Sequence, residues 1–190
     1  LSFAIIVSKV TLGKDIRNYG SGNAGLTNAY RTMGAKKTLF VLLGDIAKGA
    51  AAVSVGWALG GPVGKLTAGI FVILGHMFPL YFGFKGGKAV AVTAGIGLYM
   101  DWRLFLICIG IYLLAFLIKK TASIASLSGV TFMPITMLIL GGFSASQYVV
   151  AIAAVAFVWI MHWPNLVRLA HHEEKAFAVK KAENAAKTEK

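Results

Sequence analysis

The chain has 190 residues, of which 57% are hydrophobic and only 14% are charged, and its mean hydropathy is +0.73. This composition excludes an ordinary soluble domain and predicts an all-α, polytopic membrane protein. The net charge of +12 does not indicate a nucleic-acid partner, because Lys and Arg of membrane proteins gather on the cytoplasmic side, where anionic lipids and substrates bind. The single cysteine, Cys108, excludes an intramolecular disulfide, and no metal site is expected.

The apolar runs, taken in chain order, predict about seven membrane helices. Crossing a bilayer takes ~20 residues, so we expect residues 1–10 to be the second half of a truncated first helix, in preference to a signal peptide. The other helices are expected over residues 37–59, 63–82, 89–100, 104–118, 126–140 and 147–163, with a short helix over 23–34. Residues 1–165 then form one membrane domain, and residues 166–190 form a basic tail, either a helix on the membrane surface or a disordered end.

The distribution of positive charge supports this layout. Fifteen of the 19 Lys and Arg residues fall in segments that the layout places on one side of the membrane, and only Lys65 and Arg103 fall on the other. An excess of this kind marks the cytoplasmic side. The C-terminus and all the Gly-rich loops are therefore predicted to be cytoplasmic, which favours a shared site on that face.

The first polar motif runs from Gly20 to Arg31 and is flanked by apolar segments. Its three glycines let the backbone turn and approach a ligand closely. Its short polar side chains offer donors and acceptors, and Arg31 adds a charged fork suited to phosphate. These polar residues are Ser21, Asn23, Thr27 and Asn28, and the glycines are Gly20, Gly22 and Gly25. Because a helix is expected to start after the glycines, its free N–H groups would complete an anion site, and we expect the anion to be phosphate.

The motif allows two other interpretations. The glycines fit the dinucleotide pattern G-x-G-x-x-G, with Asp45 at a suitable distance, but Asp45 falls inside an apolar run of helical length, which argues against a dinucleotide fold. The second interpretation is a capped turn that leads into a surface helix and binds no ligand, since Ser and Asn are ordinary cap residues.

The second motif is Phe84-Lys85-Gly86-Gly87-Lys88, which leads into a helix. Gly86 and Gly87 expose backbone N–H groups where the helix dipole favours an anion, and Lys88 adds a positive charge. The motif lacks the spacing of a Walker P-loop, and its lysines could also be simple membrane anchors. A third, weaker feature is the pair Ser123 and Ser126, which would lie on one face of a helix.

Several ionisable or amide side chains are expected at or within the membrane. Asp45 and Lys48 are three residues apart, and we interpret them as a structural ion pair, since buried charges are costly when unpaired. We expect His76 to orient the loop that follows it. His162 and Asn165 lie at the end of the last helix, where Pro164 is expected to bend the chain. They are either a capping pair or a pair that contacts substrate.

Together these motifs resemble the bacterial acyl-phosphate:glycerol-3-phosphate acyltransferases of the inner membrane. The resemblance rests on the Gly20–Arg31 motif, on Gly75-His76-Met77-Phe78-Pro79 followed by the second glycine motif, on Ser123 and Ser126 after a basic pair, and on His162 and Asn165. It covers nearly the whole chain. Ala89 stands where many members have glycine, and Trp163-Pro164 replaces residues that are often more polar.

The resemblance implies seven membrane helices, no cofactor, and an acyl transfer from acyl phosphate to glycerol 3-phosphate that gives lysophosphatidic acid and phosphate. It also implies that these substrates, or their phosphate groups, are contacted by Ser21, Arg31, Lys88, Ser126, His162 and Asn165. Oligomeric state stays open, with a monomer possible.

Elementary chemistry agrees with that reaction. Acyl phosphate is already an activated anhydride, so positioning and charge stabilisation of the departing phosphate suffice, and the sequence shows no Ser-His-Asp triad. The proton of the attacking hydroxyl can go to the substrate's own phosphate or to His162. The alternative of a different class is a transporter of an anionic solute, since broken helices and basic loops suit that role too.

Overall fold

The computed structural model describes residues 1–174 and 176, and these residues form helices and loops with no strand. This confirms the all-α prediction. The elements are α1 (Phe3–Leu12), η1 (Ile16–Asn18), α2 (Leu26–Met77), η2 (Leu80–Phe82), α3 (Val90–Met100), α4 (Trp102–Lys119), α5 (Ala122–Thr131), α6 (Met133–Leu140), α7 (Ala145–Met161) and α8 (Trp163–Ala170). Residues 175 and 177–190, the greater part of the expected tail, lie outside the described residues, and α8 runs across the domain boundary expected at residue 165.

The long element α2 is three helical segments joined at two kinks. Gly34 has a φ of +75°, and Gly60 and Gly61 leave the helical conformation just before Pro62. The second kink reverses the chain, so that the backbones on either side pack closely: a Cβ on Gly56 would lie 2.4 Å from the carbonyl oxygen of Gly64. Both breaks were expected: the kink at Gly34 separates the helices expected over 23–34 and 37–59, although α2 runs through it as one element, and the break expected at Gly60-Gly61-Pro62 is present.

Helices α5 and α6 replace the single helix expected over 126–140. The break falls at Phe132, because Pro134 at the start of α6 lacks the N–H that a continuous helix would use. A second break, at His162, separates α7 from α8, and the two helices are bent by 56°. Pro164 therefore bends the chain as predicted.

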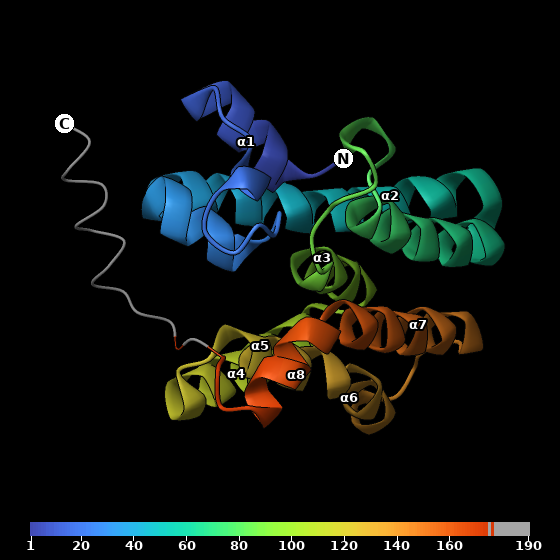
Figure 1. Ribbon diagram of the computed structural model, residues 1–190. Helices are drawn as coiled ribbons and strands as arrows, with labels where there is room; N and C mark the ends of the chain where they lie inside the picture. Colours follow the sequence, from blue (N-terminus) through green and yellow to red (C-terminus); the bar gives the residue numbers. More distant parts are fainter. Residues whose placement is uncertain (175, 177–190) are drawn as a thin grey trace.

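Helix α3 lies at the centre of the molecule. In Figure 1, α1 and α2 lie on one side of α3, and α4 to α8 lie on the other. The main apolar core joins α2, α3 and α7 through Val53, Ile73, Met77, Val92, Ile96 and Val150. The packing is close because glycine lies at the crossing of α2 and α3: a Cβ on Gly95 would lie 2.0 Å from the carbonyl oxygen of Ile46.

Three segments among the described residues are long and apolar enough to cross a membrane on their own. They are Leu26–Phe82, which holds the Gly60–Gly61 reversal, Trp102–Lys119 and Ala122–Leu140, and the bent pair of α7 and α8 makes a fourth. Helices α1 and α3 are shorter apolar helices. The expected total of seven spans stays a prediction.

Candidate active site

The first glycine loop folds around the side chain of Asn28, which is buried at the start of α2. Its Oδ1 accepts a hydrogen bond from the Ser21 N–H at 2.9 Å. Its Nδ2 donates to three backbone carbonyl oxygens, those of Ile16, Tyr19 and Asn23, at 3.0–3.1 Å. Gly20 has a φ of +61°, and a Cβ there would lie 2.1 Å from Asn28 Oδ1. We expected Asn28 to contact the substrate. In the structure its side chain instead makes hydrogen bonds to the loop backbone and stabilises the loop conformation.

The rest of this motif forms a polar surface around the start of α2. Ser21 and Gly22 are exposed, whereas Asn23, Gly25, Thr27 and Arg31 are partly buried. Gly25 is the N-cap residue of α2, so the first N–H groups of the helix point toward the loop. Among residues 1–174 and 176, no hydrogen bond or ion pair is found for Arg31. Its guanidinium is therefore available to an anion.

The second glycine loop packs directly against the first. Gly86 N donates to the Met77 carbonyl oxygen at 3.0 Å, and Gly87 N donates to that of His76 at 3.2 Å. A Cβ on Gly87 would lie 2.3 Å from His76 Nε2 and 2.6 Å from the Ala24 carbonyl oxygen. Only glycine fits between the two loops at this point, so the two predicted motifs meet there.

Beyond Gly87, the Lys88 side chain enters a polar cluster built from three distant segments. Lys88 Nζ donates to Asn165 Oδ1. Asn165 Nδ2 donates to Glu174 Oε1 at 2.5 Å, and Ser123 Oγ donates to the same oxygen at 2.9 Å. Arg168 Nε donates to Glu174 Oε2 at 2.7 Å. The cluster thus gathers the start of α3, the start of α5 and both ends of α8 around one carboxylate.

The charges in this cluster change the acidity of two of its groups. Burial lowers the pKa of Lys88 to about 8, the neighbouring Glu174 carboxylate opposes this shift, and the nearby Arg168 adds to it. The pKa of Glu174 lies below its usual value, because hydrogen bonds from Asn165, Arg168 and Ser123 outweigh the opposing effect of burial. The carboxylate is therefore ionised at neutral pH, which shows that the cluster can hold an oxygen anion.

His162 sits at the bend between α7 and α8 and is 2% exposed. Its Nδ1 lies 2.8 Å from the Val158 carbonyl oxygen. A carbonyl oxygen can only accept, so Nδ1 carries the hydrogen, and Nε2 of the neutral ring keeps a free lone pair. Asn165 lies in the first turn of α8, where its N–H donates to the His162 carbonyl oxygen at 2.8 Å. His162 therefore caps the end of α7, in line with the simpler expectation, because its side chain bonds a carbonyl oxygen in the last turn of that helix, whereas it makes no side-chain cap bond at the start of α8.

An apolar cavity of about 70 Å³ begins beside this cluster. It is lined by residues of α3, α4 and α5, among them Val90, Leu104 and Ser126, and by Met133 at the start of α6. Ser126 therefore faces a largely apolar space, while Ser123, predicted to have only a supporting role, takes part in the polar cluster. This arrangement suits a ligand with a charged head and an apolar chain.

Asp45, Lys48 and His76 form a buried polar group behind the second loop. Lys48 Nζ lies 2.8 Å from Asp45 Oδ1 and 2.9 Å from His76 Nδ1. The predicted Asp45–Lys48 ion pair is therefore present. Because His76 Nδ1 accepts from the ammonium group, its hydrogen is on Nε2, the atom beside Gly87.

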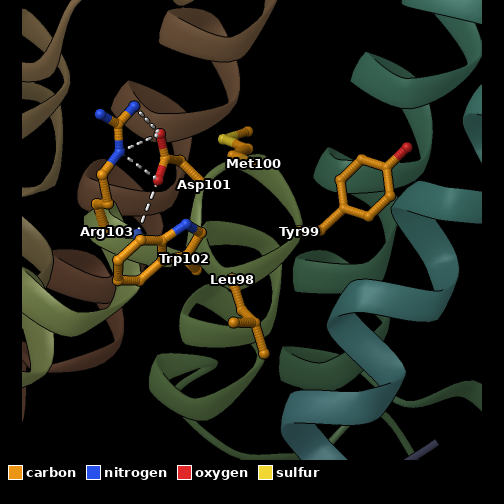
Figure 2. A pocket seen from close by; sticks show the side chains of 6 residues that line it. All are labelled: Leu98, Tyr99, Met100, Asp101, Trp102 and Arg103. Atoms are coloured by element: carbon orange, nitrogen blue, oxygen red, sulfur yellow. Dashed lines mark hydrogen bonds and ion pairs between the residues drawn. The ribbon is translucent and has the colours of Figure 1, made fainter.

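A second hollow lies away from this site. It has a volume of about 520 Å³ and is lined by Leu98, Tyr99, Met100, Asp101, Trp102 and Arg103, at the other end of α3 from Lys88. Figure 2 shows the Arg103 side chain turned onto Asp101, to which its Nη2 donates at 2.7 Å. The hollow is open and lined by consecutive residues only, and none of the predicted site residues lies there.

Sequence reasoning missed Glu174, Arg168 and Arg17. Arg17 Nη1 donates to the carbonyl oxygens of Phe82 and Lys85, so it ties the second loop to the first. Each of the three was counted only as part of a charged segment. A usable signal was the spacing of Asn165 and Arg168, which puts both on one helix face, whereas nothing in the sequence singles out Glu174 from Glu173.

Comparison with known proteins gives one consistent result. A sequence model of the family described as glycerol-3-phosphate acyltransferase matches residues 1–172. The glycerol-3-phosphate acyltransferase of Pseudomonas putida is 38% identical over 179 residues, which cover 93% of each chain.

The fold is also similar to that of PlsY, an integral membrane glycerol 3-phosphate acyltransferase. The crystal structure of its glycerol 3-phosphate form has a TM-score of 0.88 and 30% identity, and the match covers 95% of this chain and 90% of that one. Its lysophosphatidic acid form has a TM-score of 0.83 and 28% identity, with coverage of 95% and 93%.

Proposed function

Because the chain belongs to the glycerol-3-phosphate acyltransferase family, we propose that its acyl donor is acyl phosphate. The protein is an integral membrane acyltransferase that converts glycerol 3-phosphate into lysophosphatidic acid, a step of phospholipid biosynthesis. The transporter alternative is thereby set aside. The observation that carries the donor assignment is the position of the Lys88 cluster directly beside the apolar cavity between α3, α4 and α5.

Both ends of an acyl phosphate match this arrangement. The phosphate needs cationic and hydrogen-bonding groups, which Lys88, Ser123 and Asn165 supply. The fatty chain needs an apolar space, and the cavity begins where Val90 and Ser126 follow the cluster. We assign glycerol 3-phosphate to the surface of the first loop, where Ser21, the start of α2 and Arg31 offer donors to a second phosphate.

In the reaction, a hydroxyl oxygen of glycerol 3-phosphate attacks the acyl carbonyl carbon. The new ester C–O bond forms, the bond between that carbon and the phosphate oxygen breaks, and inorganic phosphate leaves with its electron pair. Lys88 stabilises the charge that develops on the leaving phosphate. The hydroxyl proton passes to a phosphate oxygen or to Nε2 of His162, whose lone pair is free because Nδ1 is bonded to Val158.

The buried group of Asp45, Lys48 and His76 has a supporting role in this proposal. His76 lies against Gly86 and Gly87, and its carbonyl oxygen accepts a hydrogen bond from the Gly87 N–H. Its function is to fix the second loop behind Lys88. The excess of positive charge on the site side further supports an inner-membrane orientation with the site and the C-terminus in the cytoplasm.

The test uses purified protein in lipid vesicles with labelled glycerol 3-phosphate. We expect lysophosphatidic acid and an equal amount of phosphate with acyl phosphate, and no product with the matching acyl thioester of coenzyme A. Lys88→Ala and Arg31→Ala should each lose one to two orders of magnitude in rate, since a hydrogen bond to a charged group is worth roughly 1.5–3 kcal/mol. Lys65→Ala, on the opposite side of the membrane, is the control. Product from the thioester and none from acyl phosphate would refute the donor assignment.

A second experiment tests the cavity. Ala94 lines it, so Ala94→Phe should fill it and raise the KM for a long-chain acyl phosphate while leaving the KM for glycerol 3-phosphate unchanged. Ala58→Phe, at an exposed position of α2, is the matched control. Equal kinetics of wild type and Ala94→Phe for both substrates would place the acyl chain elsewhere.

His162→Ala distinguishes the two routes for the proton. If His162 takes it, the acidic limb of the pH–rate profile disappears in the variant, because no imidazole remains to be protonated. If the substrate phosphate takes the proton, the variant reacts more slowly but its pH–rate profile keeps the acidic limb.

A further inference from the structure

The loop that carries Lys88 has an unfavourable backbone conformation. Gly83, Phe84 and Ala89 all have positive φ values, of +65°, +59° and +61°. For a residue with a Cβ, the left-handed conformation is strained, because the Cβ comes too close to the following carbonyl oxygen. Phe84 and Ala89 are both strained in this way, and they lie on either side of the two glycines and Lys88. Such a conformation persists only where the surroundings hold it in place.

One side of the loop is held by α2. The N–H groups of Gly86 and Gly87 donate to the carbonyl oxygens of Met77 and His76. These bonds fix the two glycines, but they do not reach the turn formed by Gly83, Phe84 and Lys85. That turn is exposed, and the Phe84 N–H, which donates to the Pro79 carbonyl oxygen at 3.1 Å, ties it only to the residues just before it. A contact from outside the loop would therefore add support.

Arg17 supplies the second support from the first loop. Its Nη1 donates to the Phe82 carbonyl oxygen and, at 3.1 Å, to that of Lys85. Its Nε and Nη2 donate to the two oxygens of Asp15 at 3.0 and 2.7 Å. Asp15 Oδ1 also accepts from the Arg17 N–H at 3.0 Å. The guanidinium therefore uses one edge for the carboxylate and its remaining nitrogen for the two carbonyls at the ends of the turn.

The contact with Arg17 changes the acidity of the Asp15 carboxyl group. Its pKa lies below the usual value, chiefly because of the hydrogen bonds from the Arg17 side chain. Both side chains are largely covered, with 17% of Asp15 and 21% of Arg17 exposed. Arg17 is thus fixed in one orientation before it meets the turn, which limits the entropy lost in holding the two carbonyls.

We propose that Arg17, oriented by Asp15, is a positioning residue that locks the second loop onto the first and thereby sets the place of Lys88. It touches neither substrate; its effect on catalysis is exerted through the backbone of residues 82–89. The inference rests on the proposed role of Lys88 at the substrate phosphate. It assigns a function to two residues that no motif analysis of the sequence singled out.

The molecule contains a matched pair that lacks this function. Asp101 and Arg103 have the same spacing as Asp15 and Arg17, and Arg103 donates to Asp101 through its N–H, Nε and Nη2 in the same way. Figure 2 shows that pair, which follows the last residue of α3, whereas Lys88 comes before its first residue. Arg103 is 53% exposed, and no bond to a loop carbonyl is found for it within the described part of the chain.

The test compares Arg17→Lys with Arg103→Lys in the full-length protein in lipid. A lysine keeps the charge but cannot hold a carboxylate with two nitrogens while reaching two carbonyls. For Arg17→Lys we expect at least a tenfold lower kcat/KM, carried mainly by a higher KM for the phosphate-bearing substrates, with a melting temperature close to that of wild type. Arg103→Lys should match wild type in every measurement.

A rescue experiment separates positioning from general damage. Ala89→Gly removes the left-handed penalty at one end of the loop, so the loop needs less external support. In the Arg17→Lys background it should restore kcat/KM at least threefold, whereas in wild type it should change it less than twofold. If Arg17→Lys does not accumulate as folded protein, Asp15→Asn, which loosens the hold on Arg17, replaces it in the same comparison.

Two results would overturn the proposal. One is a kcat/KM of Arg17→Lys within twofold of wild type. The other is a lowered kcat/KM of Arg17→Lys that the added Ala89→Gly change does not raise at all. Failure of the proposed donor is distinguishable from both, because wild-type protein itself would then give no product with acyl phosphate.

Discussion

At the scale of single residues, the site depends on amide and hydroxyl groups that organise charges. Asn28 closes the first loop with four backbone contacts, and Asn165 connects Lys88 to Glu174. Neither role is visible in the sequence, where both residues look like ligands for a substrate. The sequence did single out Lys88, Asn165 and, in a supporting role, Ser123, and these three lie together in one cluster; binding of an anion there stays a prediction.

The lowered pKa of Lys88 predicts a pH dependence. Its cation is present below about pH 8 and is lost above it, so kcat/KM for the phosphate substrates should fall as pH rises through 8. Since kcat/KM reports on the free enzyme, bound substrate does not hide the effect. Measurements of kcat/KM between pH 6.5 and 10 check this prediction. An active Lys88→Arg variant should not lose kcat/KM above pH 8, because arginine stays protonated. A flat wild-type profile up to about pH 10 would contradict it.

At the scale of secondary-structure elements, the breaks in the helices position the chemistry. The kink at Gly34 ends the short segment that carries Arg31, and the bend at His162 turns α8 so that Asn165 reaches Lys88. The sequence predicted the breaks at Gly60-Gly61-Pro62 and near Pro164, because Gly and Pro are local signals. It did not predict the break at Phe132, since there Pro134 is the only signal and lies in an otherwise apolar run.

Close packing of α2 on α3 should make the protein sensitive to a single methyl group. Gly95→Ala would bring a Cβ within 2.0 Å of the Ile46 carbonyl oxygen, a backbone atom that cannot rotate away. We expect a loss of stability of a few kcal/mol, as for other overpacked cores, seen as a lower melting temperature in detergent.

Gly110 provides the control for this prediction. It lies within α4, where a Cβ would meet nothing within 4 Å. Gly110→Ala should leave the melting temperature unchanged or raise it, since alanine is the better helix former. Equal melting temperatures for Gly95→Ala and wild type would contradict the close packing.

At the scale of the whole molecule, contacts between distant segments assemble the site. Lys88 and Asn165 are 77 residues apart, and Ser123 and Glu174 are 51 apart. Such separations cannot be read from local patterns. The positive-charge distribution nevertheless placed all these segments on one face, which is why the membrane layout, more than any motif, predicted that the loops converge.

Glu174 should stabilise this assembly, because its carboxylate accepts hydrogen bonds from α5 and α8 beside Lys88. Glu174→Gln keeps the shape but removes the charge. With each bond to a charged group worth roughly 1.5–3 kcal/mol, we expect a melting temperature lower by roughly 2–4 °C for each kcal/mol lost. The basic limb of activity should also move to lower pH, since Glu174 is the group that raises the pKa of Lys88.

Glu173→Gln is the matched control, because Glu173 is the exposed neighbour of Glu174. It should leave both the melting temperature and the pH profile unchanged. Identical behaviour of the two variants would show that the Glu174 contacts do not matter in the membrane.

The cavity lies between α3, α4 and α5, and α3 and α5 start near Lys88 and Ser123. In the proposed assignment, the acyl chain and the phosphate therefore meet at one end of the helix bundle. A lipid made there is released into the half of the bilayer that borders that end. Every turnover then adds area to one leaflet and none to the other. Growth of a flat membrane around this enzyme requires lipid to cross to the opposite leaflet at a matching rate, and without that crossing its activity would bend the membrane.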